Sequence, residues 1–203
     1  MPLQNRVLAT GEIIAHPARG IFMGNRGILH DKTQRIGRAR WRHKAWIICE
    51  LKHKDWHREV MQPGNYTELF FLDEAVAMAA GHRPCALCRR KQFNSYRQSI
   101  DFKLETSFLD DLLHRERAVP RVFQQRRHQE EIESLPGGSI YFEEHPMLVL
   151  GDAVYPVFPD CYGNPMPRPS SGIVTVLTPK TTLKALRNGY LPKMHPSLSN
   201  WEK

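Results

Sequence analysis

The sequence predicts a mixed α+β fold, and three observations carry that prediction. Short apolar runs separated by Pro and Gly fill both ends of the chain, which is typical of β-strands. The middle of the chain instead places apolar residues at helical spacing. No repeat and no long linker divides the 203 residues, a length that one domain can accommodate. We therefore expect one α+β domain over residues 1–203, with a small mixed β core and a helical sub-region over 71–135.

The N-terminal part of the chain is predicted to form strands. "GEIIAHPARGIFMGNRGILHD" alternates apolar runs with turn signals at Pro17 and Gly20, so we expect two or three short strands there. "AWIICEL" (45–51) has the length and composition of a buried strand. The β pattern continues through "HREVMQPGNYTELFFL" and is interrupted by a turn at Pro63 and Gly64.

Helices are predicted for the middle of the chain. "LDEAVAMAAG" has Asp73 as its expected N-cap and stops at Gly81, where a C-terminal glycine belongs. A second helix should run through "CRRKQFNSYRQSI", and a third should cover 107–118 and end at Pro120. "RVFQQRRHQEEIES" (121–134) is interpreted as a fourth helix.

The C-terminal part is predicted to return to strands. "SIYFEE", "MLVLGDAVYPVF" and "IVTVLTP" are the expected strands, and a Pro- and Gly-rich loop, "PDCYGNPMPRPSSG", lies before the last of them. "TTLKALRNG" is expected to be a short final helix capped by Thr181 or Thr182.

The charge of the chain favours a polyanionic partner. Lys and Arg number 29 against 21 Asp and Glu, a formal net charge of +8, and nucleic acid is the commonest partner of such a surface. The excess is concentrated in "RIGRARWRHK" (35–44) and behind the cysteine pair, whereas a third cluster is diluted by glutamates. A solvated surface is the alternative reading of each cluster. We expect DNA contacts from Arg38, Arg40, Arg42, Arg83, Arg89 and Arg90.

Neither a membrane span nor a secretory signal is predicted. No run of eighteen or more apolar residues occurs, and the first twenty residues lack the apolar stretch of a signal peptide. Four cysteines in that context favour a reducing compartment, so we expect a cytoplasmic protein whose cysteines bind metal or react.

The stretch "AAGHRPCALCRRKQF" (79–93) contains a C-x-x-C pair, Cys85 and Cys88. Two sulfurs of one tight turn converge on a single ion and form half of a tetrahedral zinc site. A redox pair at a helix N-terminus and two ordinary thiols are the alternatives. Zinc is favoured over the redox reading because thioredoxin-like pairs normally follow a strand, and here a helix is predicted just before the pair.

"FLDEAVAMAAGHRPCALCRR" (71–90) resembles the second half of the zinc-binding domain of the Ada family of methyl-phosphotriester repair proteins. The shared features are an acidic helix start, an Ala-rich turn, Arg-Pro-Cys, two residues and Cys. The longer run "PGNYTELFFLDEAVAMAAGHRPCALCRR" is similar to a group of uncharacterised bacterial proteins. The Ada resemblance implies a zinc ion held by Cys85 and Cys88 close to DNA backbone.

The chain departs from the Ada pattern upstream of this motif. Ada supplies its other two ligands from a close cysteine pair, one of which accepts the methyl group, and this chain has no such pair. Methyl transfer is therefore not expected. We expect Cys49 as third ligand, because a strand end against a C-x-x-C turn is a common zinc geometry, and His30 as fourth ligand. The other histidines considered for that place are His53, His57 and His82.

Two residues are candidates for catalysis beyond the zinc ion. Glu68 lies among apolar residues of a predicted strand, where a buried carboxylate would suit acid–base work. Cys161 lies on a loop after a strand and could act as a nucleophile beside a base. A solvent-facing glutamate and an ordinary loop cysteine are the alternatives. No hydrolase elbow, Walker loop, dinucleotide fingerprint or zinc-deaminase pattern occurs.

Three functions are consistent with this sequence. The first is a zinc-containing enzyme that modifies or repairs a base in DNA. A resemblance to small proteins of bacterial 7-deazaguanine DNA-modification clusters implies, for that enzyme, hydrolysis of a nitrile-bearing base to an amide. The others are a non-catalytic zinc module that binds nucleic acid and a zinc-stabilised nuclease. The length of the chain and its Pro- and Gly-rich loop favour the enzyme.

Overall fold

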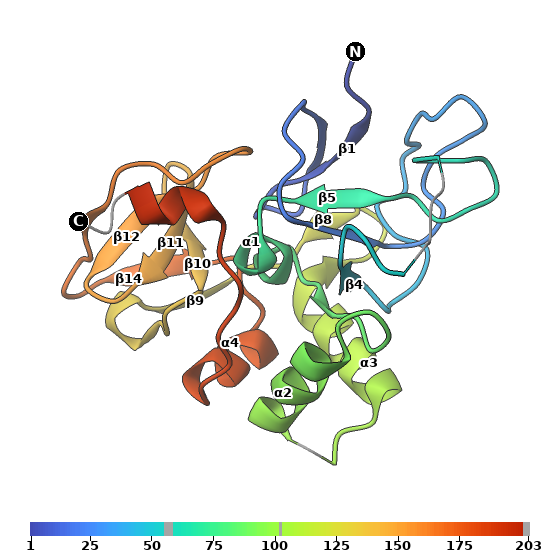
Figure 1. Cartoon of the computed structure of the whole chain (residues 1–203). Helices are drawn as coiled ribbons and strands as arrows, with labels where there is room; N and C mark the ends of the chain where they lie inside the picture. Colours follow the sequence, from blue (N-terminus) through green and yellow to red (C-terminus); the bar gives the residue numbers. More distant parts are fainter. Residues whose placement is uncertain (55–58, 102, 201–203) are drawn as a thin grey trace.

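The computed structural model describes residues 1–54, 59–101 and 103–200. Within these residues the chain forms three sheets and four α-helices, which confirms the predicted α+β class. Two six-stranded sheets lie on either side of a central helix (Figure 1). None of the helices found there has the length and apolar character needed to cross a bilayer.

The first sheet is built from the N-terminal part of the chain, in the order β2-β1-β5-β3-β4-β6. Adjacent strands of this sheet pair antiparallel, except that β1 with β5 and β4 with β6 pair parallel. The strands are β1 (Gln4–Val7), β2 (Ile13–Ala15), β3 (Phe22–Asn25), β4 (Ile47–Cys49), β5 (Leu69–Phe71) and β6 (Arg83–Pro84). The strands predicted within 11–31 and 45–51 are therefore confirmed, whereas the β pattern predicted from residue 57 onward gives a strand at Leu69–Phe71 and none over 59–68.

The second sheet is built from the C-terminal part, in the order β13-β12-β11-β10-β14-β9, with all pairs antiparallel. A short ribbon of β7 (Ala118–Val119) and β8 (Gln124–Gln125) leads into it. Its strands are β9 (His128–Glu131), β10 (Ile140–Phe142), β11 (Pro146–Leu150), β12 (Ala153–Pro156), β13 (Met166–Pro167) and β14 (Ile173–Val176). The structure also contains two short 3-10 helices, η1 (Ile132–Ser134) and η2 (Pro196–Asn200).

The helix α1 (Glu74–Ala79) is buried over its whole length between the two sheets. Asp73 caps it as predicted, because its Oδ1 accepts a hydrogen bond from the Val76 N–H at 3.0 Å. Gly81 follows the helix with φ +88°, and its N–H donates to the carbonyl of Met78 at 2.8 Å. A Cβ at Gly81 would lie 2.3 Å from Cδ of Arg117, so both the backbone angle and the space require glycine.

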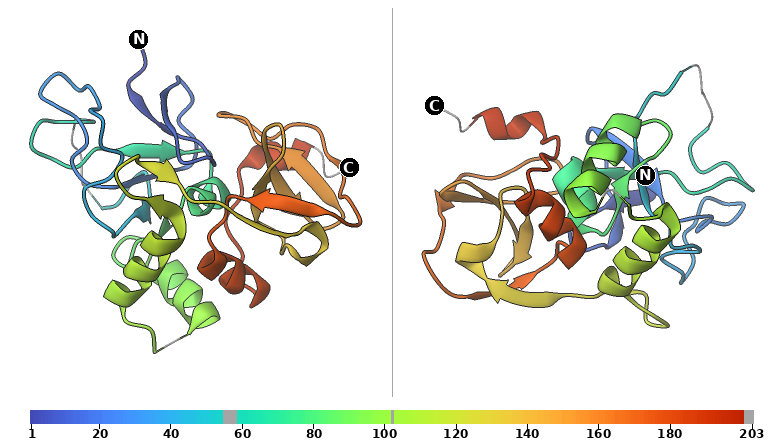
Figure 2. Two further views of the ribbon diagram at one scale, coloured as in Figure 1. Left: turned by 180° about the vertical axis from the view of Figure 1, so that it is seen from behind. Right: turned by 90° about the horizontal axis from the view of Figure 1, so that it is seen from below.

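The helices α2 (Arg90–Ile100) and α3 (Thr106–Arg117) cover one side of the first sheet, as the right-hand view of Figure 2 shows. Each forms because its apolar residues recur every three or four positions along one face. Phe93, Tyr96 and Ile100 bury the inner face of α2, and Leu109 and Leu113 that of α3. Both predicted helices are confirmed to within a few residues.

The fourth helix predicted over 121–134 is wrong. That segment forms β8, β9 and the turn η1, and the helical middle of the chain ends at Arg117 rather than at 135. β9 pairs with β14 from Glu131 opposite Ile173 to His128 opposite Val176. The segment has too few apolar residues to bury a helix face, so strand pairing at the sheet edge outweighs its helix propensity.

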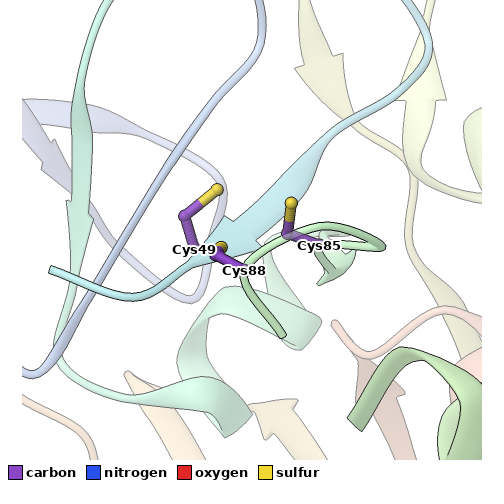
Figure 3. A group of neighbouring side chains, drawn as sticks. All are labelled: Cys49, Cys85 and Cys88. Atoms are coloured by element: carbon purple, nitrogen blue, oxygen red, sulfur yellow. The ribbon is translucent and has the colours of Figure 1, made fainter. Parts of the chain in front are cut away.

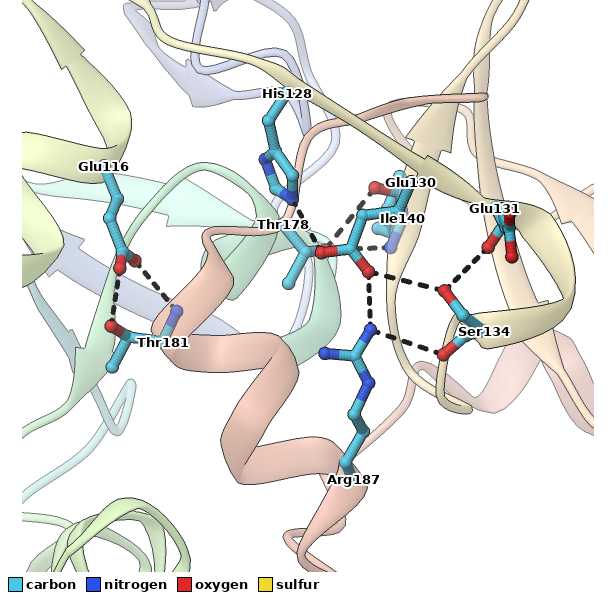
Figure 4. Close-up of polar contacts among 9 residues, drawn as sticks. All are labelled: Glu116, His128, Glu130, Glu131, Ser134, Ile140, Thr178, Thr181 and Arg187. Carbon is cyan, nitrogen blue, oxygen red and sulfur yellow. Dashed lines mark hydrogen bonds and ion pairs between the residues drawn. The ribbon is translucent and has the colours of Figure 1, made fainter. Parts of the chain in front are cut away.

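The helix α4 (Lys180–Arg187) is confirmed, but its expected cap is not. Thr181 and Thr182 lie inside the helix, and Pro179 is the N-cap residue. A residue of α3 instead accepts hydrogen bonds at the N-terminus of α4. The Glu116 carboxylate accepts one from the Thr181 N–H and one from the Thr181 hydroxyl, each at 2.8 Å (Figure 4).

A second contact holds the C-terminal end of α4 against the second sheet. Nη2 of Arg187 lies 2.5 Å from Oε2 of Glu130 on β9, and the other oxygen of that carboxylate faces His128 (Figure 4). A cation in the last turn of a helix is also favourable for the helix dipole. The helix therefore bridges α3 and the edge of the second sheet.

The two sheets share part of one hydrophobic core. Leu72, Ala75, Val76 and Ala79 of the α1 region pack in a cluster with Ile140 and other residues of the second sheet. The segment after α3 passes from one sheet to the other, as the view from behind shows (Figure 2). On that segment the Gln125 side-chain amide donates to the carbonyls of Ala9, Ala79 and Leu177.

Candidate metal centre and its cleft

Three cysteines from two separate parts of the chain come together in the first sheet. The sulfurs of Cys49, Cys85 and Cys88 all lie within 4.8 Å of one another (Figure 3). All four cysteines of the chain are free of disulfide bonds. Three converging sulfurs could hold a metal ion, and the expectation that Cys49 joins the C-x-x-C pair is confirmed as geometry. We call these three residues the cysteine group.

The sheet register explains why Cys49 meets the pair. β4 ends at Cys49, and β6 runs parallel beside it with Ile48 opposite Pro84. The Cys85 N–H then donates to the Ile48 carbonyl at 2.9 Å, so Cys85 enters its turn next to the end of β4. Cys88 follows in the same turn, just before α2 begins.

The three thiols are close enough to shift one another's pKa. The hydrogen bond from Cys49, followed by the bond from Cys88, lowers the pKa of Cys85, and the Leu87 N–H adds a further bond to the Cys85 sulfur at 3.4 Å. The hydrogen bond with Cys85, followed by the bond with Cys88, raises the pKa of Cys49. A thiolate at Cys85 is thus stabilised by its neighbours, and thiolates are the form in which cysteines bind metal.

The expected fourth ligand, His30, does not join the cysteine group. Its Nδ1 lies 2.7 Å from the hydroxyl of Thr67, and its Nε2 lies 3.3 Å from the carbonyl of Gln62. Both ring nitrogens are therefore engaged elsewhere. Among the described residues, no histidine, aspartate or glutamate completes a group with the three sulfurs.

The other histidines considered for that place differ in position. His82 is buried, and its ring contacts Arg26 through Nε2 and the Ala77 carbonyl through Nδ1. Burial, followed by the charges of Arg26 and Arg117, lowers its pKa well below the usual range. His53 lines the cleft described next, and His57 lies outside the described residues.

A cleft of about 1090 Å³ opens beside the cysteine group and is lined by all three of its residues. We call it the metal cleft. Its walls come from β1, β3, β4, β5 and the loops around them. The polar side chains along it belong to Asn5, His16, Arg19, Asn25, Glu50, Lys52, His53, Tyr66 and Glu68.

Glu68 is placed in the wall of this cleft, and its carboxylate is buried. Oε2 accepts a hydrogen bond from the Met61 N–H at 2.7 Å. Met61 has a φ of +56°, which a residue with a side chain rarely adopts, so this bond helps to fix the loop before β5. Of the two readings of Glu68, the structure therefore supports the buried carboxylate over the solvent-facing one, whereas its part in catalysis stays a prediction.

The structure does not bring Cys161, the second catalytic candidate, to the metal cleft. It lies in the loop after β12 and is absent from the described lining of that cleft. Burial, followed by the charge of Asp160, raises the pKa of the Cys161 thiol. A raised pKa keeps the sulfur protonated and weakens it as a nucleophile, so the geometry does not favour its predicted role.

Two of the six arginines expected to contact DNA are interior residues. Arg83 forms a two-point ion pair with Asp110, and Arg89 pairs with Glu74 at 2.8 Å and with Glu50 at 3.1 Å. Both are buried and their guanidiniums are engaged by carboxylates, so neither is free to contact a partner. The basic run around the cysteines is therefore partly a structural network, which corrects the prediction for these two residues.

The remaining four arginines are better placed for contacts with a partner. Arg38, Arg42 and Arg90 are exposed, and Arg40 is half-buried. Arg38 and Arg40 line a second cavity together with Trp41. Their predicted binding of DNA stays a prediction.

Sequence reasoning missed several residues of the metal cleft and of the second cavity. Asn5 and Asn25 face the metal cleft, and Arg26 and Arg117 are buried beside the second cavity. No local pattern singles them out, because each is one polar residue in or beside a short strand or a helix. Only the pairing of strands distant in sequence brings them to these sites.

Comparison with protein-family models, with curated proteins and with solved structures gave no match. The fold and the site together define a mixed α+β protein with a three-cysteine group that could hold a metal ion. The resemblance to the Ada zinc domain stays a prediction from the sequence.

Proposed function

We propose that the protein is a zinc-dependent hydrolase that acts on a base in DNA. The observation that carries the proposal is the position of the cysteine group in the wall of a large cleft that also contains Glu68. Structural zinc sites are closed by four protein ligands, whereas catalytic sites have three protein ligands and one open position. Three sulfurs beside a cleft correspond to the catalytic arrangement.

Zinc is the metal best suited to this donor set. Thiolates are soft ligands that select zinc, copper(I) or iron–sulfur clusters, and a tetrahedral site with one free position is typical of zinc. When bound there, zinc would supply an activated water molecule for hydrolysis. Cys49, Cys85 and Cys88 are the residues that would hold it.

The chain's own contribution would be proton transfer by Glu68 and positioning by the cleft. One carboxylate oxygen of Glu68 is held by the Met61 N–H, which fixes the orientation of the group. In nitrile hydrolysis, the water oxygen bonds to the nitrile carbon, and both hydrogens of the water end on the nitrogen of the amide. A carboxylate that takes a proton from water and returns it to that nitrogen balances the reaction.

Charge and size support a nucleotide as the substrate. Arg19 and Lys52 line the metal cleft and are exposed, and the chain carries a formal net charge of +8. The cleft volume of about 1090 Å³ slightly exceeds the range of ordinary ligand pockets, roughly 300–1,000 Å³. A base displaced from the helix, with its sugar and phosphate, would fit such a cleft.

Metal content is the first test. We expect one zinc ion per chain in the wild type, and its loss in Cys49→Ser, Cys85→Ser and Cys88→Ser. Cys161→Ser is the matched control and should keep its zinc. Cobalt substitution would then count the ligands, because the intensity of the sulfur-to-metal absorption reports the number of thiolates. A fourth protein ligand would appear as metal loss in His53→Ala or His57→Ala and would favour the non-catalytic module instead.

Activity is the second test. DNA containing a nitrile-bearing 7-deazaguanine base is incubated with the protein, digested to nucleosides and analysed by mass spectrometry. Wild type should increase the mass of that nucleoside by one water, and Glu68→Gln should lose turnover by at least about 100-fold while still binding DNA. Gln can keep the bond to the Met61 N–H, so folding is preserved.

The alternatives predict other results in the same experiments. A binding module would hold zinc and DNA and leave every nucleoside unchanged. A nuclease would cut plasmid DNA once magnesium or manganese is added. Either result would overturn the hydrolase proposal.

A further inference from the structure

Two buried arginines lie over the same tryptophan next to the first sheet. The guanidinium carbon of Arg26 is 4.2 Å from the centre of the Trp46 ring, and that of Arg117 is 4.1 Å from it. Arg26 is 2% exposed and Arg117 is 1% exposed. Each contact is favourable because the ring face carries negative charge density.

Neutral groups accept the hydrogen bonds of both guanidiniums. Arg26 donates to Nε2 of His82 at 3.2 Å, to the Gly11 carbonyl at 3.1 Å and to the Ala80 carbonyl at 3.4 Å.

Arg117 donates to the carbonyls of Gly81 and Lys44, and its Nε has no hydrogen-bond partner among the described residues. No ion pair to a carboxylate is found for either arginine in the part of the chain that the structure describes.

Among the described residues, neither positive charge has a carboxylate paired with it. Burial lowers the pKa of both Arg26 and Arg117 to about 9, so each still carries its charge at neutral pH. Arg40 repels Arg26, and Arg26 repels Arg117. Asp110 attracts Arg117, but its carboxylate is already engaged by Arg83. Buried charges in proteins are normally paired, so the buried positive charge of Arg26 and Arg117 indicates a site for an anion.

A cavity of about 960 Å³ lies beside these arginines, and we call it the arginine pocket. Asn25 and Ile47 line the metal cleft, whereas their neighbours Arg26 and Trp46 line the arginine pocket. The two sites therefore separate at adjacent residues, where β3 ends and β4 begins.

The lining of the arginine pocket is strongly basic and partly aromatic. Among its described residues, Glu12 is the single carboxylate; it is exposed and already accepts a hydrogen bond from Thr10. Trp41 and Phe123 form an edge-to-face pair at 4.8 Å on its wall. The arginines along it are Arg26, Arg38, Arg40, Arg117, Arg126 and Arg127.

We propose that the arginine pocket binds a phosphate monoester whose dianionic group balances Arg26 and Arg117. A phosphate monoester carries a charge of about −1.5 to −2 at pH 7, which is close to the charge of the two buried cations. The guanidinium groups of the other arginines along the pocket, Arg38, Arg40, Arg126 and Arg127, can donate to its oxygens. Trp41 on the pocket wall is an aromatic ring against which a base attached to that phosphate could pack. Such a group is found on a free mononucleotide and on the 5′-phosphorylated end of a nucleic acid.

Binding is tested by calorimetry with five probes on metal-loaded protein. These are inorganic phosphate, a 5′-mononucleotide, the corresponding nucleoside, and one single-stranded oligonucleotide with and without a 5′-phosphate. We expect the mononucleotide or the phosphorylated oligonucleotide to bind at least about tenfold more tightly than its phosphate-free counterpart, a difference of about 1.4 kcal/mol. The tighter of the two identifies the natural source of the phosphate.

Two variants from the same basic segment locate the site. Arg40→Ala removes a half-buried arginine of the pocket and should weaken phosphate binding about tenfold. Arg42→Ala removes an exposed arginine outside the described lining and should change the affinity by less than about twofold. Arg26→Gln should abolish binding, and circular dichroism would establish whether it still folds. If it does not, the comparison of Arg40→Ala with Arg42→Ala decides.

Three results would overturn this proposal: equal binding of the nucleoside and the nucleotide, no binding of any phosphate probe, or equal weakening by Arg40→Ala and Arg42→Ala. The last would indicate diffuse attraction to a basic surface. None of these measurements depends on turnover at the metal cleft, so failure of one proposal can be distinguished from failure of the other.

Discussion

The guanidinium of Arg83 and the carboxylate of Asp110 form a buried ion pair with two parallel hydrogen bonds, Nε to Oδ1 and Nη2 to Oδ2, each 2.7 Å long. Arg83 lies on β6, two residues before Cys85, and Asp110 lies on α3. The pair therefore fastens the strand that leads into the cysteine group to the helix packed against it.

Removing one partner of this pair should destabilise the protein strongly. Asp110→Ala leaves a buried, uncompensated guanidinium, so we expect the free energy of unfolding to fall by about 3–5 kcal/mol in urea denaturation. The neighbouring Asp111→Ala is the control, because Asp111 pairs with Lys44 at 2.7 Å while both side chains are about half exposed. That variant should unfold close to the wild-type midpoint. Equal effects of the two substitutions would contradict the structural role of the buried pair.

Two glycines with the same backbone angle should respond differently to alanine. Gly81 after α1 has φ +88°, and Gly189 after α4 has φ +89°. A Cβ at Gly189 meets open space, so Gly189→Ala should cost only the backbone term of about 1–2 kcal/mol. Gly81→Ala adds a collision with Arg117 and should cost clearly more in thermal or urea unfolding. If the two variants were equally stable, the close approach of Arg117 to Gly81 would be wrong.

The stability of the protein should depend on pH through Asp73. Burial raises the pKa of this carboxyl group from 3.8 to about 6, and hydrogen bonds from the Tyr162 hydroxyl, the Val76 N–H and the His195 N–H partly oppose the shift. The folded state thus binds the proton more tightly than the unfolded state. The resulting stabilisation is complete below about pH 4 and is lost as the pH rises through about 6.

This contribution of Asp73 amounts to about 3 kcal/mol for a shift of roughly two units. Asp73→Asn has no carboxyl group that titrates at this position. Relative to that variant, the wild-type free energy of unfolding should fall between about pH 4 and 6, and above pH 6 its pH dependence should be parallel to that of the variant. Urea denaturation of both proteins at a series of pH values measures the difference. Parallel curves over the whole range would exclude a raised pKa.

Removal of the proposed metal ion should destabilise the first sheet. A metal ion bound to the folded state alone stabilises it by mass action, so a chelator should lower the melting temperature of wild type and of Cys161→Ser equally. Cys49→Ser should melt at a lower temperature already and show no further change with chelator. A chelator effect of normal size in Cys49→Ser would remove Cys49 from the ligand set.

The three cysteines show what local sequence can and cannot predict. The C-x-x-C spacing identifies Cys85 and Cys88, and the strand pattern around Cys49 indicates a third ligand. Their meeting depends on the parallel pairing of β4 with β6, which no local pattern encodes. His30 was a wrong choice because its sequence position says nothing of Thr67 and Gln62, which hold its ring.

The same contrast between local patterns and contacts of distant segments applies to the helices and to the charged residues. α2 and α3 are predictable because their buried residues repeat at helical spacing. The segment 121–134 has few apolar residues, and the pairing of its residues 128–131 with β14 decides that they form a strand. Likewise Arg89 and Arg90 are adjacent in one basic run, yet the first is buried against Glu74 and the second is exposed.

The burial of α1 between the two sheets has a consequence for how the chain folds. Neither sheet can complete its core without this helix, because residues of the α1 region belong to clusters on both sides. The two halves should therefore melt in a single cooperative transition, in spite of their separate hydrogen-bonded sheets. A chain divided at the loop after β8 would leave apolar surface exposed on both fragments, and we expect neither fragment to be soluble alone.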